Sequence, residues 1–256
     1  MIKLENIEVI YGSGTDTAIR ALRIPILEVG SGCWCNVIGP NGSGKTTLLK
    51  VLSGGIDSFS GSIFIEGRNV TRWRARHLSD SVQLLEQSPE KNTIPSMTIE
   101  ENLLLYSQNG RFPSFSFLGK GSPDRIKQLL ARFEMDLELR LSSQVGLLSG
   151  GQRQAVALAA VLLRAPKVLL LDEFLVSIDR KSAPKLLSVV RETASEQGIT
   201  VLMVSHDLTH VETTGDRLII LSNGQVVDDL STADRVLHRS EIVARYSAIL
   251  ERNGIL

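Results

Sequence analysis

The segment GPNGSGKTT, residues 39–47, constrains the fold of this chain more than any other stretch. It matches the phosphate-binding pattern G-x-x-x-x-G-K-[ST]. It also lies between an apolar segment that predicts a strand, CWCNVIG, and one that predicts a helix, TLLKVLSG. Glycines allow backbone N–H groups to converge on phosphate oxygens without obstruction by a Cβ atom. The order strand, loop, helix therefore predicts a P-loop core that binds a nucleoside triphosphate.

Two side chains of this loop have specific expected roles. Lys45 places a positive charge at the β- and γ-phosphates, and Thr46 offers its hydroxyl to Mg²⁺. The other loop residues that we expect to contact the nucleotide are Gly39, Asn41, Gly42, Ser43, Gly44 and Thr47.

Two later apolar segments end in residues that suit phosphate chemistry. KVLLLDE ends in Asp172, which can hold the Mg²⁺ shell, and Glu173, which can polarise an attacking water as a general base. ITVLMVSH ends in His206. Because the carboxyl ends of parallel strands meet at one edge of a sheet, we expect His206 to reach the γ-phosphate.

A second glycine-rich turn, LSGGQ at residues 148–152, precedes another predicted helix. Free N–H groups at a helix N-terminus attract anions. Ser149, Gly150 and Gly151 are therefore candidates to donate to an anion such as a phosphate. Ser149 and Gln152 also have the spacing of a capping box, in which Ser149 only caps its own helix. Both interpretations stay open, because capping and anion binding can use different polar groups of these residues.

The remaining patterns predict an α/β fold. Alternating and glycine-bounded apolar segments near the N-terminus predict a small antiparallel β layer, and apolar strands alternating with helices predict a mainly parallel sheet. Thr98 and Glu101 form a capping-box pattern that predicts a helix. The Gly/Pro/Ser-rich stretch 108–123 predicts a mobile loop. Asn223-Gly224 predicts a hairpin turn.

These patterns predict one domain over residues 1–256 with three parts. The β layer and α/β core occupy about 1–87 and 166–230. A helical subdomain occupies about 88–165, and a helical tail follows at about 231–256.

Composition argues against two classes of protein, those that bind nucleic acid through a net positive charge and those that cross a membrane. The chain has 28 Lys and Arg against 28 Asp and Glu, so a partner nucleic acid bound by net charge is not expected. No apolar run approaches the ~20 residues that cross a bilayer as a helix. Cys33 and Cys35 lie two apart on a predicted strand, so they cannot pair with each other and are expected to be buried thiols.

Together these motifs resemble the ATP-binding subunits of ABC transporters over about residues 2–230. GPNGSGKTT is similar to the Walker A motif, LSGGQ to the family signature and LLLDE to the Walker B motif. The resemblance implies a RecA-like P-loop NTPase core, ATP with Mg²⁺, and ATP hydrolysis. It also implies roles for other residues: Asp179 as the D-loop aspartate, His206 as the switch histidine, Tyr11 as the aromatic ring that stacks on adenine, and Gln87 as the glutamine that senses Mg²⁺ and touches the membrane partner, with Gln83 as a weaker alternative.

The chain departs from the family pattern after Glu173. The family usually continues with Pro or a small or polar residue, whereas this chain has Phe174, Leu175 and Val176. Since Asp179 is retained, we expect an intact hydrolytic site with altered packing at the seam of the dimer.

The resemblance further implies partners. Two ATP-binding subunits, identical or paralogous, would enclose ATP-Mg²⁺, each nucleotide lying between one P-loop and the other subunit's signature. Transmembrane permease subunits and a separate substrate-binding protein are expected, with this chain at the cytoplasmic face of the cell membrane. The sequences of these motifs are most similar to those of bacterial importers of amino-acid-like or other small organic solutes. The alternatives are a lipid-trafficking or efflux system, or a soluble ABC ATPase without a transporter.

Overall fold

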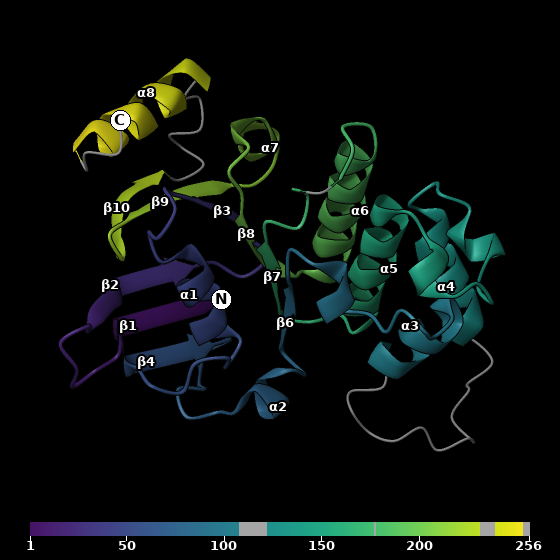
Figure 1. Cartoon of the computed structure of the whole chain (residues 1–256), viewed down its shortest axis with the longest axis horizontal. Coiled ribbons are helices and arrows are strands. Elements are labelled where there is room, and N and C mark those ends of the chain that lie inside the picture. The colour runs from purple at the N-terminus through teal and green to yellow at the C-terminus, as the bar shows by residue number, and fades with distance from the viewer. Residues whose placement is uncertain (108–121, 177, 231–238, 253–256) are drawn as a thin grey trace.

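The computed structural model describes residues 1–107, 122–176, 178–230 and 239–252, and contains two sheets with helices around them (Figure 1). The first sheet is antiparallel, in the order β2-β1-β4-β5. Its strands are β1 (Ile2–Tyr11), β2 (Ile19–Val29), β4 (Ser60–Ile65) and β5 (Arg68–Asn69). In β1 the buried side chains alternate and then change phase at Asn6, whose φ of 50° marks a bulge.

The second sheet has the order β10-β9-β3-β8-β7-β6, and all its pairs are parallel except β9 with β10. Its strands are β3 (Trp34–Ile38), β6 (Val82–Leu85), β7 (Val168–Asp172), β8 (Thr200–Val204), β9 (Arg217–Ser222) and β10 (Gln225–Leu230). Asn223 and Gly224 both have positive φ, which is the geometry of the predicted hairpin turn.

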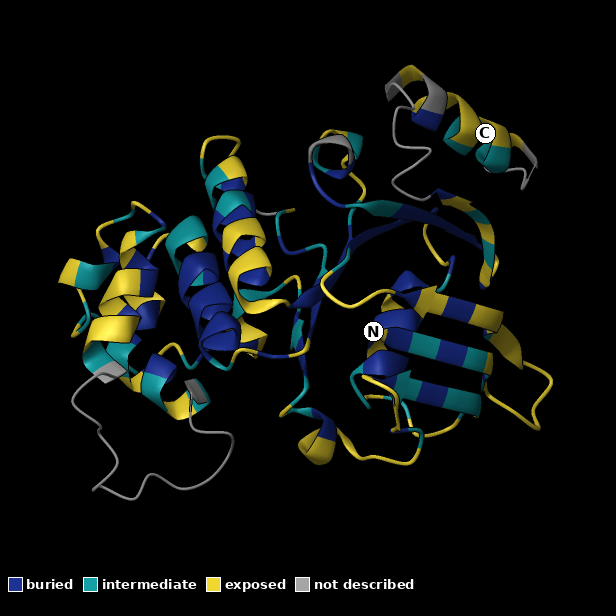
Figure 2. Cartoon of the chain, turned by 180° about the vertical axis from the view of Figure 1, so that it is seen from behind, coloured by how far each residue is buried: buried dark blue, intermediate teal, exposed yellow. Residues whose placement is uncertain are grey.

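The central strands of this sheet are buried on both faces, which explains their continuous apolar sequences. In β7, Leu169 and Leu171 face one hydrophobic cluster, and Val168 and Leu170 face another. The first cluster contains α5 (Gly150–Leu163) and α6 (Ser182–Gln197), and the second contains α1 (Lys45–Leu52) and the antiparallel sheet. Helix α5 is buried from Gln154 to Leu163, and most of it is dark blue in Figure 2.

The other helices complete the two sides. They are α2 (Ala75–Leu78), α3 (Ile99–Ser107), α4 (Ser122–Ala131), α7 (Leu208–Thr213) and α8 (Arg239–Arg252), with short 3₁₀ turns η1 (Pro89–Lys91), η2 (Leu137–Leu139) and η3 (Val145–Leu147). The capping box that begins α3 is confirmed, because Thr98 and Glu101 exchange side chain to backbone hydrogen bonds. Helices α3 and α4 pack beside α5, away from the antiparallel sheet (Figure 1).

The α/β class, the antiparallel N-terminal layer and the mainly parallel core sheet are confirmed. Cys35 is buried on β3, whereas Cys33 lies one residue before this strand and is only partly buried. The prediction of a buried thiol on the strand was therefore wrong for Cys33. Neither cysteine is in a disulfide. Most of the predicted loop at 108–123, and the tail residues 231–238 and 253–256, lie outside the described residues. Within the described ranges, no helix combines the length and apolar character that a bilayer crossing requires.

Candidate functional site

Four chain segments that carry the predicted site residues meet at one edge of the parallel sheet. The register pairs Leu85 of β6 with Leu171 of β7, and it pairs Val204 of β8 with both Asp172 and Val37. The segments that follow β3, β6, β7 and β8 therefore leave the sheet side by side, which is where ligands bind in α/β folds.

The P-loop that follows β3 packs too closely on its neighbours for side chains at two of its glycines. A Cβ atom at Gly39 would lie 2.2 Å from the carbonyl oxygen of Leu221, and one at Gly44 would lie 2.6 Å from that of Ala21. Gly44 also has a φ of 101°. At Gly42, with a φ of 78°, nothing lies within 4 Å of where a Cβ would stand. The loop therefore packs against Leu221 and Ala21 at Gly39 and Gly44, and it is open at Gly42.

Lys45 and Ser43 carry the polar groups inside this loop. The Lys45 Nζ donates to the carbonyl oxygens of Gly39, at 2.9 Å, and Pro40, at 3.0 Å. Burial lowers the pKa of Lys45, against the opposing effect of Glu173 and Asp172. The buried Ser43 Oγ has no hydrogen-bond partner among the described residues. A buried ammonium and an unpaired hydroxyl in one loop fit a phosphate group, which accepts from both.

Thr46 and Asp172 form the oxygen-rich part of the site. The Thr46 Oγ1 donates to Asp172 Oδ1 at 3.5 Å. Burial raises the pKa of Asp172, and the nearby carboxylates of Glu173 and Glu86 act in the same direction, while the bond from Thr46 opposes them. A hydroxyl beside a carboxylate whose charge is poorly compensated fits Mg²⁺, a hard cation that takes oxygen ligands.

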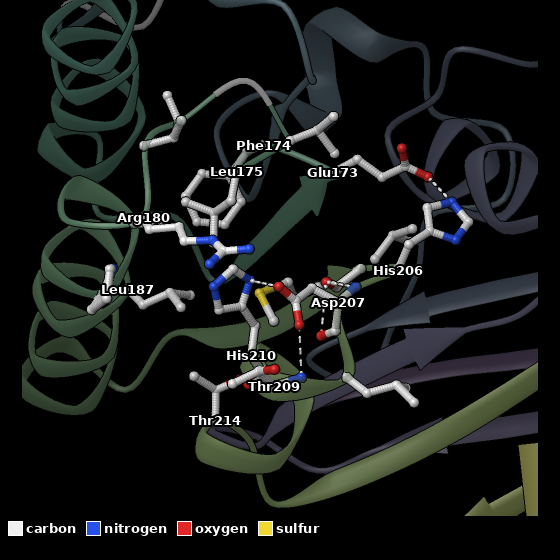
Figure 3. A pocket seen from close by; sticks show the side chains of 18 of the residues that line it. Glu173, Phe174, Leu175, Arg180, Leu187, His206, Asp207, Thr209, His210 and Thr214 are labelled. Atoms are coloured by element: carbon white, nitrogen blue, oxygen red, sulfur yellow. Dashed lines mark hydrogen bonds and ion pairs between the residues drawn. The ribbon is translucent and has the colours of Figure 1, made fainter. Parts of the chain in front are cut away.

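Glu173 and His206 are in direct contact. The Glu173 Oε1 lies 2.5 Å from His206 Nε2, and the two side chains point toward each other (Figure 3). Glu173 has a φ of 49°, a strained value for a residue with a Cβ, and its N–H donates to the Val204 carbonyl at 3.2 Å. Such strain is concentrated at functional sites. The pair can take and hold a proton between a carboxylate and an imidazole.

The apolar run after Glu173 divides between the interior and the surface. Phe174 is 2% exposed and belongs to the core, Leu175 packs partly against it, and Val176 is 59% exposed. Phe174 also lines a cleft of about 1280 Å³ between α6 and residues 205–214, with Leu187 and Arg180 (Figure 3). Of the three side chains, only Val176 is left largely free to meet another molecule.

The LSGGQ turn begins α5 with the predicted capping box. The Gln152 N–H donates to Ser149 Oγ at 3.3 Å, and the Ser149 N–H donates to Gln152 Oε1 at 3.2 Å. The capping interpretation is therefore confirmed for these groups. The N–H groups of Gly150 and Gly151, in the first turn, have no acceptor within the helix.

Asp179 lies next to this turn. A Cβ atom at Gly151 would stand 3.8 Å from Asp179 Oδ2, while Asp179 Oδ1 accepts from the Ser182 N–H at 3.0 Å. Hydrogen bonds with Ser182, first through its side chain and then through its backbone N–H, hold the pKa of Asp179 below its usual value. The signature turn and the predicted D-loop aspartate are thus neighbours in one chain.

Tyr11 lies beside the P-loop residue Thr47, and Gln87 follows β6 at the same sheet edge. Tyr11 ends β1, is 44% exposed, and its hydroxyl lies 3.4 Å from Thr47 Oγ1. Gln87 is exposed two residues after β6. Gln83 is buried within β6, and its amide donates to the backbone carbonyls of Ser79 and Val82. The geometry favours Gln87 over Gln83.

The motifs did not identify Asn36. This amide is fully buried in the middle of β3. A polar residue inside the apolar run CWCNVIG was the signal in the sequence, because a buried amide needs partners.

Comparisons with known proteins show the family of the chain. A family model described as ABC transporter matches residues 24–176. The chain is 35% identical over 209 residues to the tyrosine transport ATP-binding protein of Clostridioides difficile, covering 82% of this chain and 83% of that protein. It is 34% identical over 241 residues to a thiamine import ATP-binding protein of Jannaschia sp., covering 94% and 97%. A solved dimeric ATP-binding cassette, in a post-hydrolysis state bound to ADP and Pi, superposes with a TM-score of 0.78 at 27% identity, covering 91% of this chain and 99% of that one.

Proposed function

This chain belongs to the ABC transporter family as an ATP-hydrolysing subunit, and we propose that it drives import of amino-acid-like or other small organic solutes through transmembrane permease subunits. The similar proteins named for tyrosine transport and thiamine import support this cargo class and direction. In this proposal a separate substrate-binding protein delivers the solute, and the chain is held at the cytoplasmic face of the cell membrane by the permease subunits.

The observation that carries the proposed chemistry is the meeting of the P-loop, Asp172, Glu173 and His206 at one sheet edge. Lys45 and the P-loop N–H groups bind the phosphates, and Tyr11 stacks on adenine. Thr46, Asp172 and Gln87 hold Mg²⁺, which when bound neutralises charge on the phosphates.

Glu173 accepts the proton of the attacking water through its carboxylate. His206, in contact with Glu173 through Nε2, orients that carboxylate beside the γ-phosphate. The strained backbone of Glu173 fixes the direction of its side chain at the end of β7.

A second subunit supplies the rest of the site in this proposal. Helix α1, which begins at the P-loop, and α5, which begins at the signature, pack on opposite faces of the parallel sheet. Ser149, Gly150, Gly151 and Gln152, with the adjacent Asp179, would therefore face the γ-phosphate bound by another chain. The dimeric arrangement of the similar solved cassette supports this.

The helical part of the chain would transmit conformational changes at the nucleotide to the permease subunits. We place the helical subdomain at about 88–165 and the core at about 1–87 and 166–230, with the tail at 231–256. Gln87 lies at the junction between core and helical part, so movement at the nucleotide reaches α3 to α5 through it.

The test is transport by the natural assembly. The chain is purified from its native membranes with its bound subunits and reconstituted in vesicles, and ATP-dependent movement of labelled tyrosine and thiamine is measured. We expect a polytopic membrane protein to copurify and solute to move toward the side that carries the cassette, with no movement in an assembly carrying Glu173→Gln. Movement away from the cassette would establish efflux, and no membrane partner would establish a soluble ATPase.

A further inference from the structure

Asn36 forms a buried hydrogen-bond junction on β3. Its Oδ1 accepts from the Trp34 Nε1 at 3.0 Å, and its Nδ2 donates to the carbonyl oxygens of Val211, at 3.0 Å, and Thr214, at 2.7 Å. The amide is 0% exposed. A buried amide costs free energy unless it is bonded, so these contacts fix both its orientation and the position of its acceptors.

The two acceptors belong to the segment that carries His206. This segment runs from Ser205, after β8, through α7 to Thr214. At its start the Ser205 N–H donates to the Val37 carbonyl at 3.3 Å, and at its end Val211 and Thr214 accept from Asn36. Both ends are therefore bonded to β3, the strand that continues into the P-loop.

The end of this segment has little room to move. A Cβ atom at Gly215 would lie 2.7 Å from both the Asn36 Nδ2 and the Trp34 Cδ1. The Asp216 N–H donates to the Trp34 carbonyl at 2.6 Å, and the Asp216 carboxylate accepts from the Trp34 N–H at 2.9 Å. The Thr214 Oγ1 donates to the His210 carbonyl at 2.6 Å. The junction is therefore packed as well as bonded.

We infer that Asn36 is a positioning residue for His206, because it fixes the segment of residues 205–214 relative to the P-loop. The inference rests on the role proposed for His206 in hydrolysis. Through Asn36, the strand that ends in the phosphate loop also sets where the imidazole lies beside Glu173. Without the amide, Val211 and Thr214 lose their bonds from Asn36, and His206 spreads over more positions while the P-loop keeps its own packing.

The test compares two buried asparagines. Asn102 is also 0% exposed; it accepts from the Ile94 N–H at 2.7 Å and donates to the carbonyls of Ile94, at 3.0 Å, and Thr98, at 2.9 Å. Asn36→Ala and Asn102→Ala remove the same chemical group together with four and three side-chain hydrogen bonds, respectively, so each should lower the Tm. Asn102 contacts a different part of the chain and serves as the control for loss of stability alone.

Turnover and ATP affinity are measured for both variants, together with the His206 imidazole NMR signal, assigned by its loss in His206→Gln. Since a small misplacement of a reacting group is costly, we expect Asn36→Ala to lower kcat about tenfold or more with Kd for ATP within about twofold of wild type. The His206 signal should shift or broaden in this variant only. Asn102→Ala should keep kcat within about threefold of wild type.

If Asn36→Ala fails to fold, Trp34→Phe removes the indole donor to Asn36 Oδ1 together with part of the buried ring, and should lower kcat by more than Asn102→Ala does, again without loss of ATP affinity. Equal kcat losses in Asn36→Ala and Asn102→Ala, or loss of affinity together with turnover, would overturn the inference. If His206→Gln is inactive while Asn36→Ala folds and is fully active, the inference about Asn36 is overturned and the proposed role of His206 is not. Wild-type turnover in His206→Gln would instead overturn the proposed role of His206.

Discussion

Burial controls the charge balance where β7 meets the P-loop. The pKa of Asp172 is raised and that of Lys45 is lowered, in both cases mainly because the charged form is removed from water. Each group then carries a charge that the folded chain compensates only partly. In the proposed complex, a phosphate chain with Mg²⁺ would supply the opposite charges, so we expect this region to be less stable without the ligand.

Asp172→Asn tests that balance. A carboxyl whose pKa is raised on folding binds its proton more tightly in the folded chain, so ionisation reduces stability as the pH rises through the unfolded and then the folded pKa. At pH 7 the neutral amide should therefore raise the Tm of the nucleotide-free chain, by the equivalent of roughly 0.5–2 kcal/mol, while hydrolysis falls. Differential scanning fluorimetry at several pH values measures this. A gain that does not shrink as the pH falls toward about 4 would contradict the charge explanation.

At the scale of single elements, local patterns account for most of what the sequence predicted. The P-loop with its flanking strand and helix, and the capping boxes at Thr98 and Ser149, depend on neighbours within a few residues. Asn36 could not be assigned, because its partners at Val211 and Thr214 lie 175 and 178 residues away and only the folded sheet brings them near. The burial of Phe174 likewise depends on where α5 and α6 pack.

The two capping boxes allow the roles of Ser149 to be separated. Ser149→Ala and Thr98→Ala each remove an N-cap hydroxyl, so each should lower the free energy of unfolding by about 1 kcal/mol. If Ser149 also serves a second subunit, only Ser149→Ala should lower ATP turnover beyond this shared effect. Urea unfolding and steady-state hydrolysis provide both measurements. Equal turnover in the two variants would restrict Ser149 to capping its own helix.

At the scale of the whole molecule, the proposed function implies that one chain carries two halves of different sites. The P-loop leads into α1 on one face of the parallel sheet, and the signature leads into α5 on the other. A symmetric dimer would bring each half to its complement on the partner and form two equivalent sites. We propose that hydrolysis takes place in such shared sites.

Complementation between two inactive variants measures this claim directly. Lys45→Ala removes the P-loop cation. Gly150→Asp places a carboxylate in the first turn of α5, where it favours the helix but repels a γ-phosphate. A dimer with one copy of each variant has one site with an intact P-loop and an intact signature. Random mixing should make about half of the dimers mixed, each with one of its two sites restored, so the mixture should reach about a quarter of wild-type turnover.

The control mixes Lys45→Ala with the double variant Lys45→Ala/Gly150→Asp, which contains no intact P-loop and should stay inactive. ATP hydrolysis is measured for each variant alone and for both mixtures. We expect restored turnover only in the mixture of Lys45→Ala with Gly150→Asp. Turnover of that mixture no higher than the mean of its two components would contradict a site shared between two copies of this chain.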